Sequence, residues 1–221
     1  MFHIVRIQEI FQVTHDVKCF RIEKPPGYQF VPGQATDLSI NQPGLEEETR
    51  PFTFTGLRDH PYLEFTIKRY PERHGVTDRL HQLKPDDELI IRDPWGAIEY
   101  KGPGYFLAGG AGITPFIAIL RDLYQKNMLA GNKLFFSNKT AADIIYEQEL
   151  KEMLKQEVLF ILTRTHGEES EKARLDAAFL NRRITDFNKH FYICGPDPMV
   201  LDLVAAVQKI GAPVDAVVFE K

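Results

Sequence analysis

Four short segments of the sequence combine residue types that are typical of nucleotide-binding sites. The first is Gly109–Pro115 (GGAGITP), whose glycines let the backbone approach a phosphate group closely. Pro115 suits the first turn of a helix, and a helix N-terminus offers unpaired N–H groups to an anion. The spacing is G-x-G-x-x-P, not the common G-x-G-x-x-G, so the segment alone also fits a plain strand–helix turn.

The second segment is Cys194–Met199 (CGPDPM), which follows another apolar run. Ligands of an open parallel sheet bind outside the carboxyl ends of its strands, near the point where the strand order reverses. A cysteine at a strand end is commonly a buried apolar residue. The Gly-Pro turn after Cys194 favours a position that faces a ligand.

The third and fourth segments lie earlier in the chain. Arg50–Thr55 (RPFTFT) places a permanent cation, an aromatic ring and a hydroxyl on one extended segment. Ile67-Lys68-Arg69 is followed by Gly75-Val76-Thr77 at the start of a predicted helix, which makes a second candidate anion site. Each segment alone also fits an ordinary amphipathic strand.

The first hundred residues predict strands, because apolar and polar residues alternate along short runs that turn residues separate. Six such runs are typical of a small antiparallel barrel. One helical turn is predicted over Thr77–Leu83, with Thr77 as the N-cap. The predicted strands are Ile4–Phe11, Val17–Glu23, Ala35–Ile40, Pro51–Thr55, Leu63–Ile67 and Glu88–Arg92.

After Gly102-Pro103-Gly104, apolar strands alternate with helices, which indicates a parallel sheet covered on both faces. We expect two domains: residues 1–102 form the barrel and residues 103–221 form an α/β domain with five strands. The predicted strands are Tyr105–Ala108, Leu134–Phe136, Val158–Thr163, Phe191–Cys194 and Val214–Phe219. The predicted helices lie near residues 115–126, 144–155, 175–181 and 199–210.

The composition limits the classes of function. A formal charge of −4 argues against a nucleic-acid binder. Two cysteines predict neither a metal site nor an iron–sulfur cluster within these 221 residues. The first residues do not resemble a signal peptide. The uncharged run Gly102–Leu120 contains glycines and prolines, so it predicts strand, loop and helix and not a membrane span. We expect a soluble, cytoplasmic protein.

The four segments together resemble, in order and in type of element, the motifs of the ferredoxin–NADP(+) reductase superfamily. The matching residues are Arg50-Pro51-Phe52-Thr53, Gly75-Val76-Thr77, Gly109–Pro115 and Cys194-Gly195-Pro196. The resemblance covers nearly the whole chain. It implies an N-terminal six-stranded barrel for FAD or FMN and a C-terminal nicotinamide-nucleotide domain, with the flavin in the cleft between them.

The resemblance also assigns roles in flavin binding. Arg50, beside Pro51, would pair with the flavin phosphate, which suits the fixed donors of a guanidinium. Phe52 would lie against the isoalloxazine, where many members of the family have Tyr, and Thr53 would bind near its N5 atom. Gly75-Val76-Thr77 favours FAD over FMN. The segment expected to hold the pyrophosphate and neighbouring atoms comprises Ile67, Lys68, Gly75, Val76 and Thr77.

For the nicotinamide nucleotide, the resemblance implies binding by Gly110, Gly112, Thr114, Gly195 and Pro196. Cys194 and Glu220 would act at the reaction centre together with Thr53. Many members end in an aromatic residue that covers the flavin, and here none follows Glu220. Thr163 and Arg164, with added charge from Lys139, favour NADPH over NADH as the donor.

The expected activity is that of an enzyme that moves a hydride from NAD(P)H to FAD and electrons on to a separate protein. Ferredoxin or flavodoxin is the leading acceptor. The alternatives are a reductase component of an oxygenase and a reductase of free flavin or a small molecule. A non-catalytic flavin-binding subunit of a larger complex is a further alternative, although such electron-transfer subunits carry a cysteine cluster that these residues lack.

Overall fold

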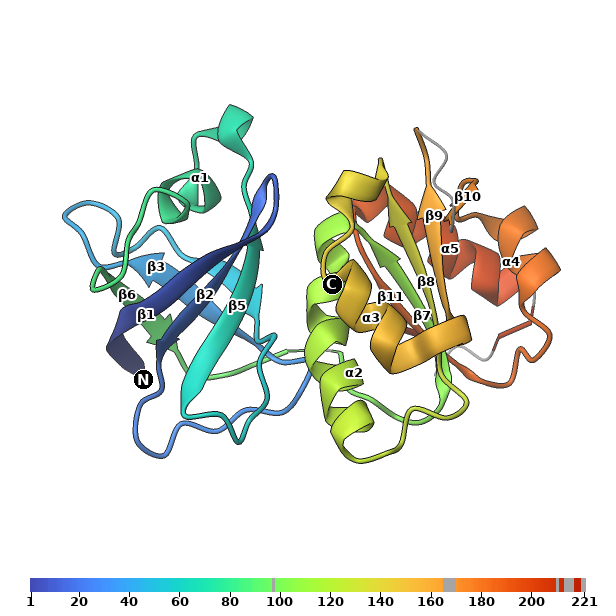
Figure 1. Cartoon of the computed structure of the whole chain (residues 1–221), viewed down its shortest axis with the longest axis horizontal. Coiled ribbons are helices and arrows are strands. Elements are labelled where there is room, and N and C mark those ends of the chain that lie inside the picture. The colour runs from blue at the N-terminus through green and yellow to red at the C-terminus, as the bar shows by residue number, and fades with distance from the viewer. Residues whose placement is uncertain (97, 165–169, 210, 213–216, 220–221) are drawn as a thin grey trace.

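A computed structural model describes residues 1–96, 98–164, 170–209, 211–212 and 217–219. The chain folds into two halves that lie side by side, an antiparallel barrel and a parallel sheet flanked by helices (Figure 1). Helix α2 (Thr114–Gln125) belongs to the second half and lies on its barrel-facing side. The two predicted halves are therefore both present.

The barrel consists of six antiparallel strands in the order β4-β3-β6-β1-β2-β5. Its outer strands meet through a bridge between Phe54 and Phe65 and a 2.8 Å hydrogen bond from the Thr55 N–H to the Glu64 carbonyl, which closes the sheet. Inward-facing residues such as Phe20, Phe54 and Phe65 fill the centre. The strands are β1 (Phe2–Thr14), β2 (Val17–Glu23), β3 (Ala35–Ile40), β4 (Arg50–Thr53), β5 (Tyr62–Lys68) and β6 (Glu88–Arg92).

A short helical segment follows β5, as the sequence predicts, but its start differs. A 3₁₀ turn η1 (Pro71–Arg73) precedes helix α1 (Val76–Leu80). The N-cap of α1 is Gly75, in an extended conformation and without a side-chain hydrogen bond. The prediction of Thr77 as the N-cap was therefore wrong, because the chain turns two residues earlier at a glycine that needs no side-chain cap.

Among the described residues, the second half contains six parallel strands in the order β10-β9-β8-β7-β11-β12. Each of the five predicted strands overlaps one of these, although the first three residues of the predicted run Val214–Phe219 lie outside the described residues. The prediction of five missed β10, a three-residue strand that has too short a pattern to detect. The strands are β7 (Gly104–Gly109), β8 (Lys133–Asn138), β9 (Val158–Leu162), β10 (Ser170–Lys172), β11 (His190–Cys194) and β12 (Val217–Phe219).

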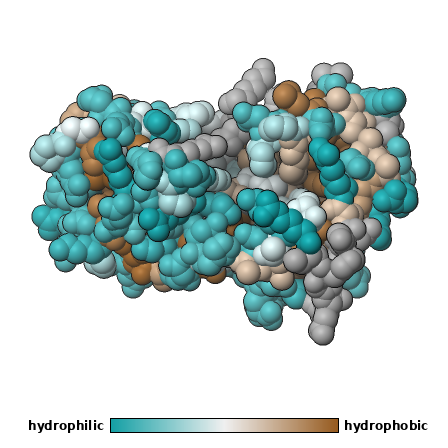
Figure 2. All heavy atoms as spheres, turned by 90° about the horizontal axis from the view of Figure 1, so that it is seen from above, coloured by the Kyte–Doolittle hydropathy of each residue, from teal (hydrophilic) through white to brown (hydrophobic). Residues whose placement is uncertain are grey.

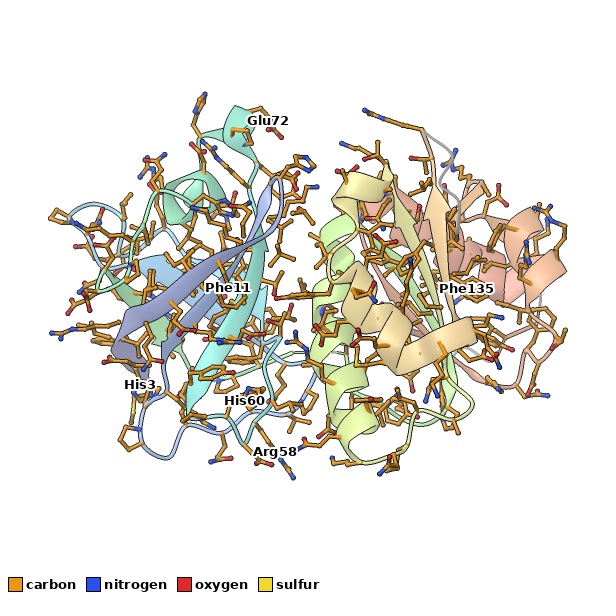
Figure 3. All side chains as sticks on the ribbon, viewed as in Figure 1. His3, Phe11, Arg58, His60, Glu72 and Phe135 are labelled. Atoms are coloured by element: carbon orange, nitrogen blue, oxygen red, sulfur yellow. The ribbon has the colours of Figure 1, made fainter. Side chains whose placement is uncertain are left out.

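Helices cover both faces of this sheet. Alternate residues of β7 face opposite sides, so Phe106 and Ala108 pack with α2 and α3, whereas Tyr105 and Leu107 pack with α4 and α5. Phe135 of β8, labelled in Figure 3, belongs to the second of these groups. The helical segments are η2 (Gly110–Ile113), α2, η3 (Ala141–Asp143), α3 (Glu147–Leu154), η4 (Lys155–Glu157), α4 (Ala177–Arg183) and α5 (Asp197–Lys209).

A cluster of charges joins the two halves. Arg121 of α2 donates from Nη1 to the Glu64 carboxylate of β5 at 2.6 Å and to the Thr55 carbonyl at 2.7 Å. The same guanidinium binds both carboxylate oxygens of Glu149 in α3, at 2.6 and 2.9 Å. Arg21 of β2 binds the other Glu64 oxygen at 3.2 Å. Side chains from two helices, α2 and α3, and two strands, β2 and β5, thereby connect α2 with the barrel.

Burial and charge act in opposite directions on this cluster. Burial raises the pKa of the Glu64 carboxyl, but the charge and hydrogen bonds of Arg121 and Arg21 outweigh it and hold that pKa below its usual value. Burial lowers the pKa of Arg121, but its hydrogen bonds to Glu149 and the charge of Glu64 outweigh burial. The pKa of Arg121 is therefore raised above its usual value. Both Glu64 and Arg121 are therefore charged at neutral pH.

The uncharged run at Gly102–Leu120 is strand β7, turn η2 and the first part of α2, as predicted. Within the described ranges, the structure contains no helix with the length and apolar character needed to cross a membrane.

Candidate cofactor-binding site

The predicted nucleotide-binding segments meet at one edge of the parallel sheet. β7 and β11 are neighbours, with Leu107 paired to Ile193 and Ala108 to Cys194, so the segments that follow these strands lie beside each other. In Figure 1 the arrowheads of β8 and β9 point to the upper edge, where α1 of the barrel also lies. Glu72, two residues after Tyr70, marks that end of the barrel in Figure 3. Figure 2 looks onto this edge.

Glycines allow the two segments to touch through their backbones. A Cβ atom on Gly112 would overlap with the carbonyl oxygen of Cys194, so no larger residue fits without a shift. Gly110 has a φ of +52°, and a Cβ built there would meet no atom within 4 Å. Gly112 thus permits close packing of the two segments, and Gly110 leaves open space beside the loop.

A cleft of about 620 Å³ lies over these loops and reaches across to the barrel. It brings together seven of the predicted site residues: Lys68, Gly110, Gly112, Thr114, Cys194, Gly195 and Pro196. Ala111 and Asp197, which belong to the two predicted loop segments but had no role of their own, also line it, and so does Tyr70, which was not predicted. Tyr70 follows Lys68-Arg69 directly, and its position next to a predicted anion site was the signal that could have identified it.

A second pocket of about 170 Å³ adjoins the first and extends over the ends of β8 and β9. Thr163, predicted to contact the nucleotide, lines this pocket beside Asn138 and Lys139. The Thr163 hydroxyl donates to the Asn138 carbonyl at 3.2 Å. The residues common to both pockets are Lys68, Gly109, Gly110, Lys139 and Pro196. An elongated ligand that crosses the glycine loop can therefore occupy both.

Lys68 extends from the end of β5 into this cleft and forms a 2.8 Å ion pair with Asp16, which lies in the turn between β1 and β2. Burial raises the pKa of the Asp16 carboxyl, but the hydrogen bond and charge of Lys68 outweigh it, so the pKa is lowered. The side chain of Lys68 is mostly buried. The pair holds one cation at a fixed place on the barrel side of the cleft.

Thr53 connects the barrel segment RPFT with the glycine-rich loop. Its hydroxyl donates to the Thr114 hydroxyl at 2.9 Å, and the Thr114 hydroxyl donates to the Ala111 carbonyl at 3.0 Å. Two residues predicted from separate motifs are thus in direct contact.

The other residues of the RPFT segment lie with Thr53 on β4, the first strand in the order of the barrel sheet. Arg50 is exposed, and its guanidinium donates to the Thr49 carbonyl at 2.6 Å. In the described part of the chain, no carboxylate pairs with it. Pro51 is exposed as well, and the partly buried Phe52 packs against the barrel core. The guanidinium and one ring are accordingly available to a ligand on this surface.

Other predicted residues lie outside the two pockets. The side chains of Ile67 and Val76 belong to the barrel core, and the Ile67 carbonyl contacts His81 Nε2 at 2.8 Å. These two residues could contact a ligand only through the backbone. Gly75 and Thr77 lie at the start of α1. Arg164 is exposed next to Thr163, and Glu220 falls outside the described residues.

These features fit an anionic dinucleotide and a flavin. An open glycine loop at the start of α2, with Lys68 and Lys139 lining the same cleft, offers N–H groups and positive charge to a pyrophosphate. The open space at Gly110 is a cradle that a Cβ would partly fill. On the barrel, the Arg50 guanidinium offers charged N–H donors that could bind a second phosphate.

A barrel of this kind, joined to a parallel sheet with a glycine loop at the shared cleft, defines a two-domain flavin- and nicotinamide-dependent class of protein. Comparison with known families agrees with that class. Residues 4–100 match the oxidoreductase FAD-binding domain and residues 106–204 match the oxidoreductase NAD-binding domain. The chain therefore consists of an oxidoreductase FAD-binding domain followed by an oxidoreductase NAD-binding domain, the pair that its motifs, by their resemblance to the ferredoxin–NADP(+) reductase superfamily, lead us to expect.

Two curated relatives are reductase components of monooxygenases. The reductase component of propane 2-monooxygenase from Rhodococcus jostii is 28% identical over 98% of this chain and 62% of its own length. The glycine betaine monooxygenase reductase subunit from Pseudomonas aeruginosa is 32% identical over 89% of this chain and 57% of its own length. The chain spans about 60% of the length of these relatives.

Solved structures show the same fold at low identity. The FAD/NAD-binding domain of nitric oxide dioxygenase from Vibrio cholerae superimposes with a TM-score of 0.87 at 19% identity, over 98% of this chain and 97% of that one. A ferredoxin NADP+ reductase from Neisseria gonorrhoeae with bound FAD and NADP superimposes with a TM-score of 0.81 at 19% identity, over 95% of this chain and 92% of that one.

Proposed function

We propose that the chain is an NAD(P)H-dependent flavoprotein reductase that delivers electrons to an oxygenase component. The observation that carries this proposal is the cleft in which the glycine loop, the end of β11 and the barrel residue Lys68 come together. The Thr53–Thr114 hydrogen bond supports it, because it joins the flavin-type motif to the nicotinamide-type motif. The domain boundary lies between residues 102 and 103.

On the barrel side, Arg50 would bind the flavin phosphate and Phe52 would pack against the ring system. The phosphate-binding role of Arg50 is supported by its exposed guanidinium. Thr53 would hold the reactive edge of the ring through its hydroxyl, at the place where that hydroxyl now meets Thr114. A bound flavin supplies the ability to take two electrons as a hydride and to release them singly.

On the parallel-sheet side, Gly110 and Gly112 would approach the pyrophosphate, and Cys194 with Glu220 would orient the nicotinamide. The position of Cys194 in the larger cleft supports this role. Thr163, Arg164 and Lys139 would favour NADPH. Lys139 in both pockets and Thr163 in the smaller one support that preference.

The proposed acceptor follows from the relatives. Both curated relatives described above are named as parts of monooxygenases, which favours an oxygenase component over the ferredoxin, flavodoxin and free-flavin alternatives. The 221 residues contain two cysteines, too few to hold a four-cysteine iron–sulfur cluster. The next electron carrier is therefore outside these residues.

We place the protein in the cytoplasm, in line with its composition.

The proposal is tested by purifying the protein with FAD and measuring cytochrome c reduction with NADPH or NADH. Each acceptor is then added in turn: an oxygenase component, a ferredoxin, a flavodoxin and free flavin. We expect bound FAD, turnover with NADPH and stimulation by the oxygenase component. Stimulation by free flavin alone would contradict the proposed acceptor, and a colourless protein without turnover would contradict the proposed activity.

A further inference from the structure

Tyr146, the residue before helix α3, has a backbone conformation that is unusual for a bulky side chain. Its φ is +55° and its ψ is +38°, in the left-handed region that favours glycine. The sequence predicts a helix near residues 144–155, but α3 begins at Glu147, directly after this residue. Strain of this kind persists only where the surrounding contacts hold it, so the contacts of the Tyr146 side chain indicate its role.

The Tyr146 side chain reaches from the parallel-sheet half to the barrel. Its Oη atom lies 3.0 Å from Oγ1 of Thr66 in β5, within hydrogen-bond distance. Thr66 is 5% exposed, and its Oγ1 lies 3.1 Å from Oγ1 of the buried Thr55. The Arg121 guanidinium of α2 lies over the Tyr146 ring, with its carbon 4.9 Å from the ring centre. The ring is thus in contact with α2 while its hydroxyl binds the barrel.

The hydrogen bonds of Tyr146 continue into the charged cluster between the two halves. The Thr55 hydroxyl donates to Oε1 of Glu64 at 3.2 Å, so a chain of hydrogen bonds joins Tyr146, Thr66, Thr55 and Glu64. Burial raises the pKa of Tyr146, so its hydroxyl keeps its proton at neutral pH. A buried, satisfied network of this kind is directional and specifies one arrangement of the groups that it joins.

Two further contacts attach the second half to the barrel, and both are made by α2. Thr114, the first residue of α2, accepts from the Thr53 hydroxyl at 2.9 Å, and Arg121, about two turns further along, donates to Glu64 at 2.6 Å. Attachments along one helix define an axis and leave rotation about that axis free. Tyr146 precedes a different helix, so its bond to Thr66 opposes this rotation.

Other contacts between the halves guide their orientation less closely. Val17 of β2 packs into the apolar core of the second half, and apolar contact is not directional. His15 Nε2 lies 3.9 Å from Oδ1 of Asp143, but the His15 side chain is 59% exposed, and exposed pairs contribute little. Within the described part of the chain, Tyr146–Thr66 is therefore a buried hydrogen bond that attaches the second half to the barrel at a point away from α2.

We propose that Tyr146 is a positioning residue for hydride transfer: its bond to Thr66 prevents the parallel sheet from turning about α2. This inference rests on the proposed function, in which a hydride carries two electrons from the nicotinamide ring to the flavin. Cys194 belongs to the sheet and Thr53 to the barrel, so a turn of the sheet would change the separation of the two binding sides. Small misplacements of reacting groups lower the rate strongly.

The kinetic test measures reduction of bound flavin in rapid mixing, over a range of concentrations of whichever nicotinamide nucleotide reduces wild type faster. Tyr146→Phe removes the hydroxyl and keeps the ring. We expect the limiting rate to fall about tenfold, with the nucleotide Kd and the flavin content unchanged, because the binding groups within each half are intact. A limiting rate equal to that of wild type would overturn the inference.

Thr66 variants show whether the effect belongs to this hydrogen bond. Thr66→Val removes the partner hydroxyl and should also lower the limiting rate, whereas Thr66→Ser retains a hydroxyl and should stay near wild type. Tyr146→Phe combined with Thr66→Val should lose no more than Thr66→Val alone, since both remove the same bond. Independent, multiplied losses in the double variant would overturn the inference.

Tyr124 provides a matched control, because it lies in α2 of the same half and is 54% exposed. Tyr124→Phe should leave the limiting rate unchanged. A loss equal to that of Tyr146→Phe would attribute the effect to any missing tyrosine hydroxyl and would overturn the inference.

The orientation of the two halves is measured without turnover, from the distance between two spin labels. Ile4→Cys in β1 and Leu201→Cys in α5 provide exposed attachment sites on opposite sides of α2 (Figure 1), and the native Cys19 and Cys194 are buried. In the FAD-loaded protein, we expect one narrow distance distribution for the wild-type background and for Tyr124→Phe, and a broader or shifted one for Tyr146→Phe. An unchanged distribution in Tyr146→Phe would overturn the inference. Absence of flavin reduction in wild type would instead contradict the proposed function, so the two failures are distinguishable.

Discussion

Replacing Arg121 with methionine should destabilise the protein by about 3 kcal/mol, because it leaves the buried Glu64 carboxylate with one cationic partner in place of two. Removing one partner of a buried ion pair costs about 3–5 kcal/mol. The Glu64 side chain is 4% exposed, and Arg121 is its nearer partner, at 2.6 Å. Arg21 stays at 3.2 Å and compensates in part, so we expect the lower end of that range. The Thr55 carbonyl also loses a donor.

The control is Arg174→Met, which removes an ion pair with Asp202 whose side chains are 74% and 63% exposed. Exposed pairs contribute about 0–1 kcal/mol. Urea unfolding of both variants, followed by circular dichroism and by fluorescence of Trp95, gives the comparison. Equal destabilisation by the two substitutions would refute the role of the cluster. In a double-mutant cycle, Arg121→Met and Glu64→Gln should together cost less than the sum of the single changes.

The same cluster predicts a dependence on pH. The folded-state pKa of Glu64 lies below its usual value, so its contribution to stability is present above the unfolded pKa of about 4.3 and is lost as the pH falls through the folded value. As the pH is lowered below about 5, the free energy of unfolding of wild type should therefore fall by more than that of Glu64→Gln. Parallel losses in both proteins would contradict this assignment.

Three further predictions concern the cofactors. Arg50→Ala should weaken flavin retention by roughly 1.5–3 kcal/mol, the range for a charged hydrogen bond, and flavin affinity equal to wild type would remove Arg50 from the site. Arg164→Ala should raise KM for NADPH and leave KM for NADH nearly unchanged, and equal effects would refute selection for the 2′-phosphate. Cys194→Ala should slow reduction of bound flavin in rapid mixing without changing flavin content, because small misplacements of the reactants lower the rate strongly. A normal reduction rate with lower thermal stability would assign Cys194 to the core alone.

Local sequence patterns predicted most of the fold. The bounds of β2, β3 and β6 agree with the predicted runs residue for residue, because each run is a short stretch with apolar residues that turn residues separate from the next. The glycine-rich segment was also predictable, since Gly110 adopts a positive φ and Gly112 permits an approach to Cys194 that a Cβ atom would block. β10 was not predictable, because three residues are too few to show a period.

Contacts between distant residues were beyond local patterns. Glu64, Arg121 and Glu149 each read as ordinary surface charges, and only the packing of α2 against the barrel brings them together. The same holds for Lys68, predicted as a phosphate ligand, whose partner Asp16 comes from another turn. Tyr146 falls within the helix predicted near residues 144–155, so the sequence pattern predicted neither its positive φ nor its contact with Thr66. Both are visible only in the folded chain.

The most direct test of the central claim is an anaerobic titration of the FAD-loaded protein with NADPH and with NADH, followed at the absorption band of oxidised flavin. The account predicts that the nicotinamide nucleotide bleaches the band to completion with one equivalent per bound flavin, because one hydride carries both electrons. An unchanged flavin band after excess NADPH and excess NADH would contradict it.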